Sequence, residues 1–112
     1  MVGEFMKRIN IAIDFSDTPL GRYDPDDGPF SGEKFRETLL RPALNDGEVT
    51  VLIDGTEGYG SSFLDEAFGG LVRKGYFTAD QLQKKLKIEC TDPDYAIYRD
   101  LIWKYINEAR KK

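Results

Sequence analysis

The stretch Ile53–Phe63, "IDGTEGYGSSF", contains the residue types best suited to chemistry in this chain. It joins a strand-like apolar run to a helix-like one through three glycines and two serines. A strand, a glycine-rich loop and a serine-headed helix form the usual phosphate-binding loop. A serine in this position is also well placed for regulatory phosphorylation. The stretch therefore raises two hypotheses, an anion pocket and a phosphoserine switch.

The glycine loop departs from a nucleotide-hydrolysing loop at one decisive position. Gly55 and Gly60 have the spacing of the G-x-x-x-x-G-K-[ST] motif, but Ser61 stands where that motif has lysine. Glu57 adds negative charge to a loop that would have to hold phosphates. We therefore expect no P-loop enzyme. Sensing of a small ligand or nucleotide by the loop and the helix N-terminus remains the alternative hypothesis.

Ser62 also has a purely structural interpretation. Ser62 followed by Asp65 matches the S-x-x-[DE] pattern of a capping box, in which the serine hydroxyl accepts an N–H group at the helix start. The glycines would then provide only tight backbone geometry. On the residues alone, the capping and switching roles both stay open.

The composition narrows the possible functions. The chain has 112 residues, no histidine, one cysteine and a formal net charge of −4. Without histidine, Ser-His and Cys-His nucleophiles and most zinc sites are excluded, so we expect no enzyme, no catalytic residue, no metal and no cofactor. Excess negative charge argues against nucleic acid and anionic membranes as partners.

The same features predict one domain in a reducing compartment. No run approaches the about 20 apolar residues that cross a bilayer. Cys90 has no partner for an internal disulfide, which favours the cytoplasm. Residues 1–5, "MVGEF", read as an expression scar, so we expect a single domain over residues 6–112.

Hydrophobic periodicity predicts alternating strands and helices. Residues 8–15 alternate as a strand, and residues 49–54 form a nearly continuous apolar strand. Helices are expected after Ser31, over residues 61–74, from Thr78 and from Pro93. A short strand is expected at residues 87–91. Pro42 should end or kink the first helix, and Gly75 should cap the second. This order predicts an α/β domain, a mixed β-sheet with helices packed on it.

Two long runs resemble a known family. "FSDTPLGRYDPDDGPFSGEKFRETLLRPAL" and "VLIDGTEGYGSSFLDEAFGGLVRKG" are similar to the bacterial STAS-like family, whose function is unassigned. That family in turn resembles the STAS domain of anti-sigma factor antagonists. The similarity runs from about residue 9 to residue 106, and "GYGSSFLDEAFGGLVR" is its most specific part.

The resemblance implies a role for the two serines. In STAS domains a strand leads to an Asp-Ser-Ser-Gly turn, and a partner kinase of the histidine-kinase-like ATPase superfamily phosphorylates the second serine. Ser62 matches this phosphoacceptor and Ser61 the serine before it. Gly60 stands in place of the Asp and Phe63 in place of the Gly.

The resemblance also implies a protein partner, an ATPase or anti-sigma-type kinase, and leaves a homodimer open. The helix after the serines would carry the partner surface. The expected partner- or anion-binding residues are Gly58, Tyr59, Gly60, Phe63 and Asp65, with Arg22 and Tyr23 from the preceding loop; Phe63 is equally suited to the core. Asp24, Asp26 and Asp27 lack calcium-loop spacing and are expected as solvated turn residues.

Overall fold

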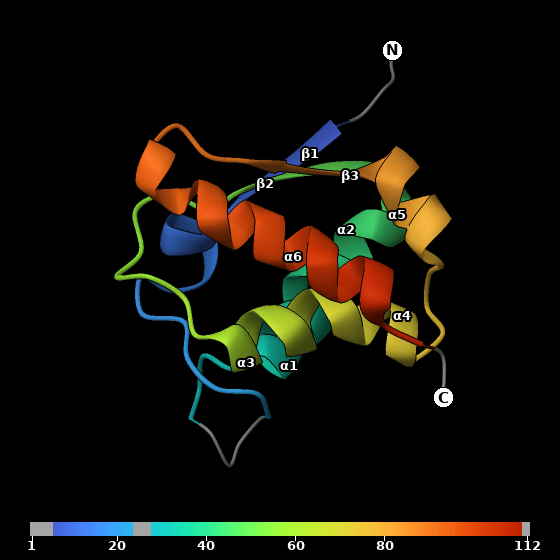
Figure 1. The fold of residues 1–112 in the computed structure, drawn as a ribbon, viewed down its shortest axis with the longest axis horizontal. Helices are drawn as coiled ribbons and strands as arrows, with labels where there is room; N and C mark the ends of the chain where they lie inside the picture. The colour runs from blue at the N-terminus through green and yellow to red at the C-terminus, as the bar shows by residue number, and fades with distance from the viewer. Residues whose placement is uncertain (1–5, 24–27, 111–112) are drawn as a thin grey trace.

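Three parallel strands lie together along one side of the molecule, and the long helices pack beside them (Figure 1). The structure is a computed structural model that describes residues 6–23 and 28–110. The strands are β1 (Met6–Asn10), β2 (Glu48–Leu52) and β3 (Leu86–Glu89), in the order β1-β2-β3. The predicted scar at residues 1–5 and the three acids of residues 24–27 lie outside the described residues.

The predicted α/β class is confirmed, but the sheet is not mixed. Both strand pairs are parallel, with Val51 of β2 opposite Ile9 of β1 and Ile88 of β3. Each strand-to-strand connection contains helices that return the chain to the same end of the sheet, and this crossover produces parallel pairing. Within the described residues the sheet is therefore parallel throughout.

The first crossover is one helical stretch, residues 32–46. It consists of α1 (Gly32–Phe35), a π-helical segment η2 (Arg36–Leu40) and α2 (Arg41–Asp46). The helix begins after Ser31, as predicted, and Ser31 caps it, because its hydroxyl accepts the N–H of Lys34. The helix does not end at Pro42. Proline lacks one backbone donor, and the irregular π turn directly before it accommodates that loss.

The second crossover begins with another helical stretch, residues 61–73. It consists of α3 (Ser61–Leu64), a π-helical segment η3 (Asp65–Gly69) and α4 (Gly70–Arg73). Gly75 follows it with a φ of 77° and closes its end, as predicted. The predicted helix at Thr78 is α5 (Ala79–Lys85), and Thr78 forms a capping box with Gln81. The chain closes with η4 (Pro93–Tyr95) and α6 (Ala96–Glu108).

The first strand is shorter than its alternation predicts. After Asn10 the chain enters a π-helical turn, η1 (Ile11–Phe15), and Ile13 is 79% exposed. The side chain of Asn10 accepts the N–H of Ile13, and Asp14 accepts the N–H of Asn10. These local side-chain hydrogen bonds compete with the strand ladder and end it.

A single core joins the sheet to the two crossover helices. α1 and α3 approach closely at Gly32, where an added Cβ would lie 2.5 Å from the carbonyl oxygen of Phe63. Fully buried phenyl rings fill the space around this crossing: Phe35, Phe63 and Phe68. In the described part of the chain, no helix is both long and apolar enough to cross a membrane.

Candidate functional site

The two serines are the first residues of α3, and both are exposed. The N-cap is Gly60, which has no side chain to accept the free N–H groups of the first turn. The capping box expected from Ser62 and Asp65 is therefore wrong. Asp65 instead accepts hydrogen bonds from Arg22 and Arg73, which turn its carboxylate away from the helix start. Ser62 therefore does not have the capping role that was the alternative to phosphorylation.

Two N–H groups of the glycine loop before the serines are bonded to other parts of the protein. Gly55 and Gly58 have φ values of 88° and 102°, a conformation that other residues rarely adopt. The N–H of Gly58 donates to Thr56 Oγ1 at 3.2 Å, and the N–H of Glu57 donates to the carbonyl oxygen of Asp17 at 2.8 Å. A phosphate-binding loop needs its N–H groups free to point at the ligand, and these two are engaged.

Tyr59 is partly buried and has a structural role in the loop. Its hydroxyl donates to the carbonyl oxygen of Ile53 at 2.8 Å, and its ring packs against Phe63, Tyr95 and Tyr98. Burial raises the pKa of Tyr59. The side chain therefore stays neutral and holds the loop on the core.

Asp54 ties the start of the loop to the end of β3, a role that the sequence reading missed. Its carboxylate accepts the N–H and hydroxyl of Thr91 and the N–H of Asp92. Burial raises the pKa of Asp54, but these hydrogen bonds outweigh it and leave the pKa below its ordinary value. An aspartate directly after a buried strand was the only signal, and it does not identify a partner 37 residues away.

A shallow hollow of about 370 Å³ lies beside the serine helix start. It is lined by Thr18–Leu20 on one side and by Glu57–Gly60 and Tyr98 on the other. Leu20 is 66% exposed at its rim. Phe63, also expected at this surface, is fully buried and contributes to the core alone. The accessible surface is therefore the two serines, the glycine loop and the exposed leucine.

Arg22 reaches the same helix one turn after the serines. Its Nη1 donates to Asp65 Oδ2 at 2.8 Å, and Arg73 Nη1 donates to Asp65 Oδ1 at 2.9 Å. The bond to Asp65 raises the pKa of Arg22. Burial raises the pKa of Asp65, but the bonds from Arg22 and Arg73 outweigh it and hold the pKa below its ordinary value. The Arg22 loop therefore contacts the serine helix at Asp65 and Glu66, beyond the serines themselves.

A buried ion pair lies beneath this cluster and has no counterpart in the sequence reading. Arg36 is fully buried, and its Nη1 donates to Glu66 Oε2 at 2.8 Å and to the Glu66 carbonyl oxygen at 2.7 Å. Its Nε donates to Glu37 Oε2 at 2.8 Å. Burial lowers the pKa of Arg36, but these carboxylates outweigh it, and the side chain stays charged. The sequence indicated this pair only by placing one charged residue, Arg36 or Glu66, on the apolar face of each crossover helix.

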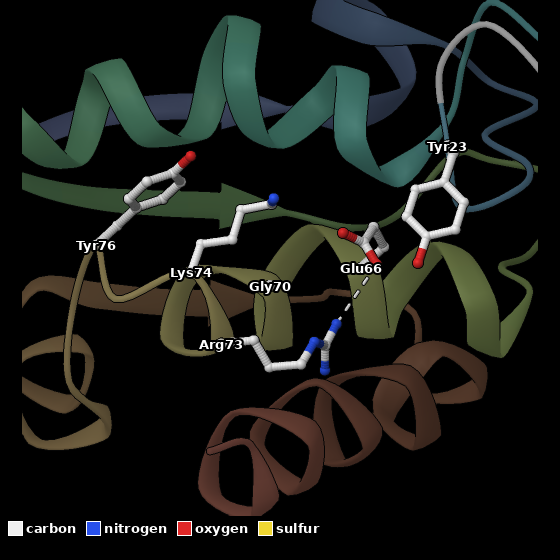
Figure 2. A pocket seen from close by; sticks show the side chains of 6 residues that line it. All are labelled: Tyr23, Glu66, Gly70, Arg73, Lys74 and Tyr76. Atoms are coloured by element: carbon white, nitrogen blue, oxygen red, sulfur yellow. Dashed lines mark ion pairs between the residues drawn. The ribbon is translucent and has the colours of Figure 1, made fainter. Parts of the chain in front are cut away.

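Tyr23 lies apart from the serines. It is 50% exposed and lines a second hollow with Glu66, Arg73 and three other residues (Figure 2).

Cys90 is partly buried near Arg99, with 3.9 Å between its sulfur and an arginine nitrogen. Across residues 6–23 and 28–110, no group of His, Cys, Asp and Glu side chains has a metal-binding arrangement.

Comparison with known proteins gives one match. The model of a family described as a STAS-like domain of unknown function (DUF4325) matches residues 31–96, more than half of the chain. The matched region includes the first crossover helix, β2, the glycine loop, the serine helix and β3. Searches of curated proteins and of solved structures returned no match.

Proposed function

Because the chain belongs to the STAS-like domain family, we propose that it is a cytoplasmic protein-interaction module with a serine switch. It docks through the start of α3 onto a kinase-type regulator, a histidine-kinase-like ATPase or an anti-sigma-type kinase. Ser62 is the phosphoacceptor, with Ser61 as the neighbouring candidate.

The observation that carries this proposal is the uncapped pair of exposed serines. Serine at a helix start normally caps the helix, yet here the cap position is Gly60 and both serines are exposed. Within the described residues neither hydroxyl makes a cap bond, so a kinase could modify it at no cost in stability.

The surroundings of the serines supply a docking surface. The hollow beside Gly58–Gly60 has an exposed apolar residue, Leu20, and a tyrosine, Tyr98, within reach of a partner that approaches the serines. Tyrosine is enriched at the central contacts of protein interfaces, and an exposed apolar side chain beside it adds area that a partner can bury.

Phosphorylation at Ser62 would act on the partner more than on the fold. A phosphoserine carries about −1.5 to −2 charges, which the positive end of the helix dipole tolerates. The same charge in an interface must be desolvated, so it releases a partner that offers no matching cation. Asp65, three residues on, adds like charge on the same helix.

The alternative hypothesis is ligand sensing by the glycine loop together with the start of α3, and no observation at the loop supports the loop's part in it. The N–H groups of Glu57 and Gly58 are already bonded within the protein. We therefore do not carry it forward for this loop.

The proposal is tested by affinity capture from lysate of the source organism. Baits are the wild-type chain, Ser62→Asp and Ser62→Ala. We expect wild type and Ser62→Ala to recover a kinase-type ATPase, and Ser62→Asp to lose it. A second experiment with ATP and mass spectrometry should then place phosphate on Ser62 of the wild type.

The matched control is Gln83→Asp, which adds the same charge on exposed α5, far from the start of α3 (Figure 1). It should recover the partner like the wild type. Equal recovery by Ser62→Asp would remove Ser62 from the mechanism, and failure of every bait to recover an ATPase or kinase would overturn the proposed partner class.

A further inference from the structure

A second hollow, of about 490 Å³, lies along η3 and α4 (Figure 2). Its lining residues are Tyr23, Glu66, Gly70, Arg73, Lys74 and Tyr76. It shares no lining residue with the hollow beside the serines. In Figure 2 the Tyr76 and Tyr23 rings stand at its two ends, with Lys74 and Glu66 between them and Arg73 below.

Among the described residues, the charges around this hollow are predominantly positive. We count the charged side chains that line it or that interact directly with Glu66, Arg73 or Tyr76. The cations are Arg22, Arg36, Arg41, Arg73 and Lys74, and the anions are Glu37, Asp65 and Glu66. A net positive site on a chain of net charge −4 stands out from its background, and such a concave site attracts anions.

The acids around the hollow pair with the arginines and not with Lys74. Glu66 is held by Arg36, Arg22 and Arg73, and Asp65 by Arg22 and Arg73. Lys74 is exposed, and no ion pair joins it to another side chain of the described residues. Figure 2 shows its ammonium group directed into the space between Tyr76 and Glu66.

A buried guanidinium lies behind the wall of the hollow. Gly70 lines the hollow, and an added Cβ at Gly70 would overlap Nη1 of Arg36. The guanidinium of Arg36 therefore packs directly against Gly70, a residue that lines the hollow. Its Nη2 is buried and, within the described residues, has no hydrogen-bond partner. A buried charged donor without an acceptor is rare and calls for a nearby acceptor.

From this geometry we propose that the hollow between Tyr23 and Tyr76 is a binding site for a small oxyanion, the phosphate or carboxylate group of a metabolite. Lys74 pairs with the anion, and the tyrosines flank the rest of the ligand. The arginines hold Glu66 and Asp65 and so prevent these carboxylates from neutralising Lys74. The site is independent of the serine switch.

The test is a two-dimensional amide NMR titration of the full chain with inorganic phosphate and, separately, with succinate. Ionic strength is held constant with sodium chloride, and the pH is held at 7 with a buffer. We expect saturable shifts centred on the amides of Gly70, Lys74 and Tyr76. Lys74→Glu should weaken the binding about tenfold or more, since it replaces an attractive charge by a repulsive one.

Lys84→Glu is the matched control, because it makes the same charge change on exposed α5. It should change the affinity less than about twofold, as expected for a distant screened charge. Melting curves confirm that both variants are folded. Saturation by phosphate alone assigns a phosphate ligand and by succinate alone a carboxylate.

Three results would overturn the site. These are the absence of saturable shifts with either anion, shifts centred on Ser61 and Ser62, and equal weakening by Lys74→Glu and Lys84→Glu.

Discussion

Ser62, like its neighbour Ser61, differs from Ser31 and Thr78 in making no helix cap. Ser31 and Thr78 both accept a backbone N–H at the start of their helices, whereas Ser62 lies one residue inside α3 and is exposed. A serine in this position costs the fold nothing when it is modified. This contrast separates the candidate switch from the structural serine and threonine.

Ser62→Asp should therefore keep or slightly raise the free energy of unfolding. Negative charge in the first turn of a helix interacts favourably with the helix dipole, by about 0.3–1 kcal/mol. Urea denaturation of the variant beside the wild type measures the change. A loss of stability above the experimental error would show that Ser62 has a structural role.

Asp65 is the residue that links the Arg22 loop to α4. Asp65→Asn removes the charge that both Arg22 and Arg73 contact and should lower the free energy of unfolding by about 1–3 kcal/mol. The same denaturation experiment measures it. Asp46→Asn is the control, because its ion pair with Lys7 is exposed, and it should change stability by less than about 1 kcal/mol.

The lowered pKa values of Asp65 and Glu37 also predict a pH dependence. Both groups bind protons less readily in the folded than in the unfolded chain, so their contribution to stability is complete above their ordinary pKa values of 3.8 and 4.5. It is lost as the pH falls through the lower folded-state values. Melting temperatures should therefore fall on acidification, and less steeply for Asp65→Asn. An equal slope in both proteins would contradict the assignment to Asp65.

At this scale the sequence identifies single residues better than their partners. The caps at Ser31 and Thr78 depend on neighbours within three residues, so they are predictable. The absence of a cap at Ser62 is not predictable from nearby residues, because Asp65 is engaged by Arg22, 43 residues earlier. The pairing of Arg36 with Glu66 likewise depends on two helices meeting in the fold.

The two crossover helices position both proposed sites. α3 brings the serines to the surface, and η3 and α4 carry the second hollow. The close crossing at Gly32 sets the distance between the helices, because the Phe63 carbonyl occupies the space of a side chain there. The helix contact, more than any loop, fixes where the serines emerge.

Gly32→Ala should therefore be destabilising, by about 1–3 kcal/mol, because its Cβ would overlap backbone that cannot move independently. Gly60→Ser is the matched control. No atom lies within 4 Å of its added Cβ, and serine is a good N-cap, so stability should change by only a few tenths of a kcal/mol. Equal melting temperatures for Gly32→Ala and wild type would contradict the close crossing.

Element positions were predictable where local signals agree, and not where side chains intervene. The helices after Ser31 and from Thr78 and Pro93 follow cap and proline signals. The strand at residues 8–15 ends early because the side chains of Asn10 and Asp14 bond to nearby N–H groups. Alternation of apolar residues does not predict these side-chain hydrogen bonds.

At the scale of the whole molecule, three parallel strands and two crossovers place the glycine loop beside the start of α6. Tyr59 of the loop packs against Tyr95 and Tyr98, and the hydroxyl of Tyr95 donates to the carbonyl oxygen of Thr56. The α/β class was predictable from the order of the elements. Helices between the strands indicated parallel pairing, but not that every pair in the described sheet would be parallel.

The central claim, that the start of α3 is the partner surface, is tested most directly by photo-crosslinking in cells of the source organism. A photoreactive amino acid replaces Ser61 or Leu20 at the surface, with Lys84 and Lys104 as exposed control positions. Mass spectrometry identifies the adducts. We predict crosslinks to a kinase-type ATPase from positions 61 and 20 and none from 84 and 104. Adducts with that partner from the control positions alone would contradict the account.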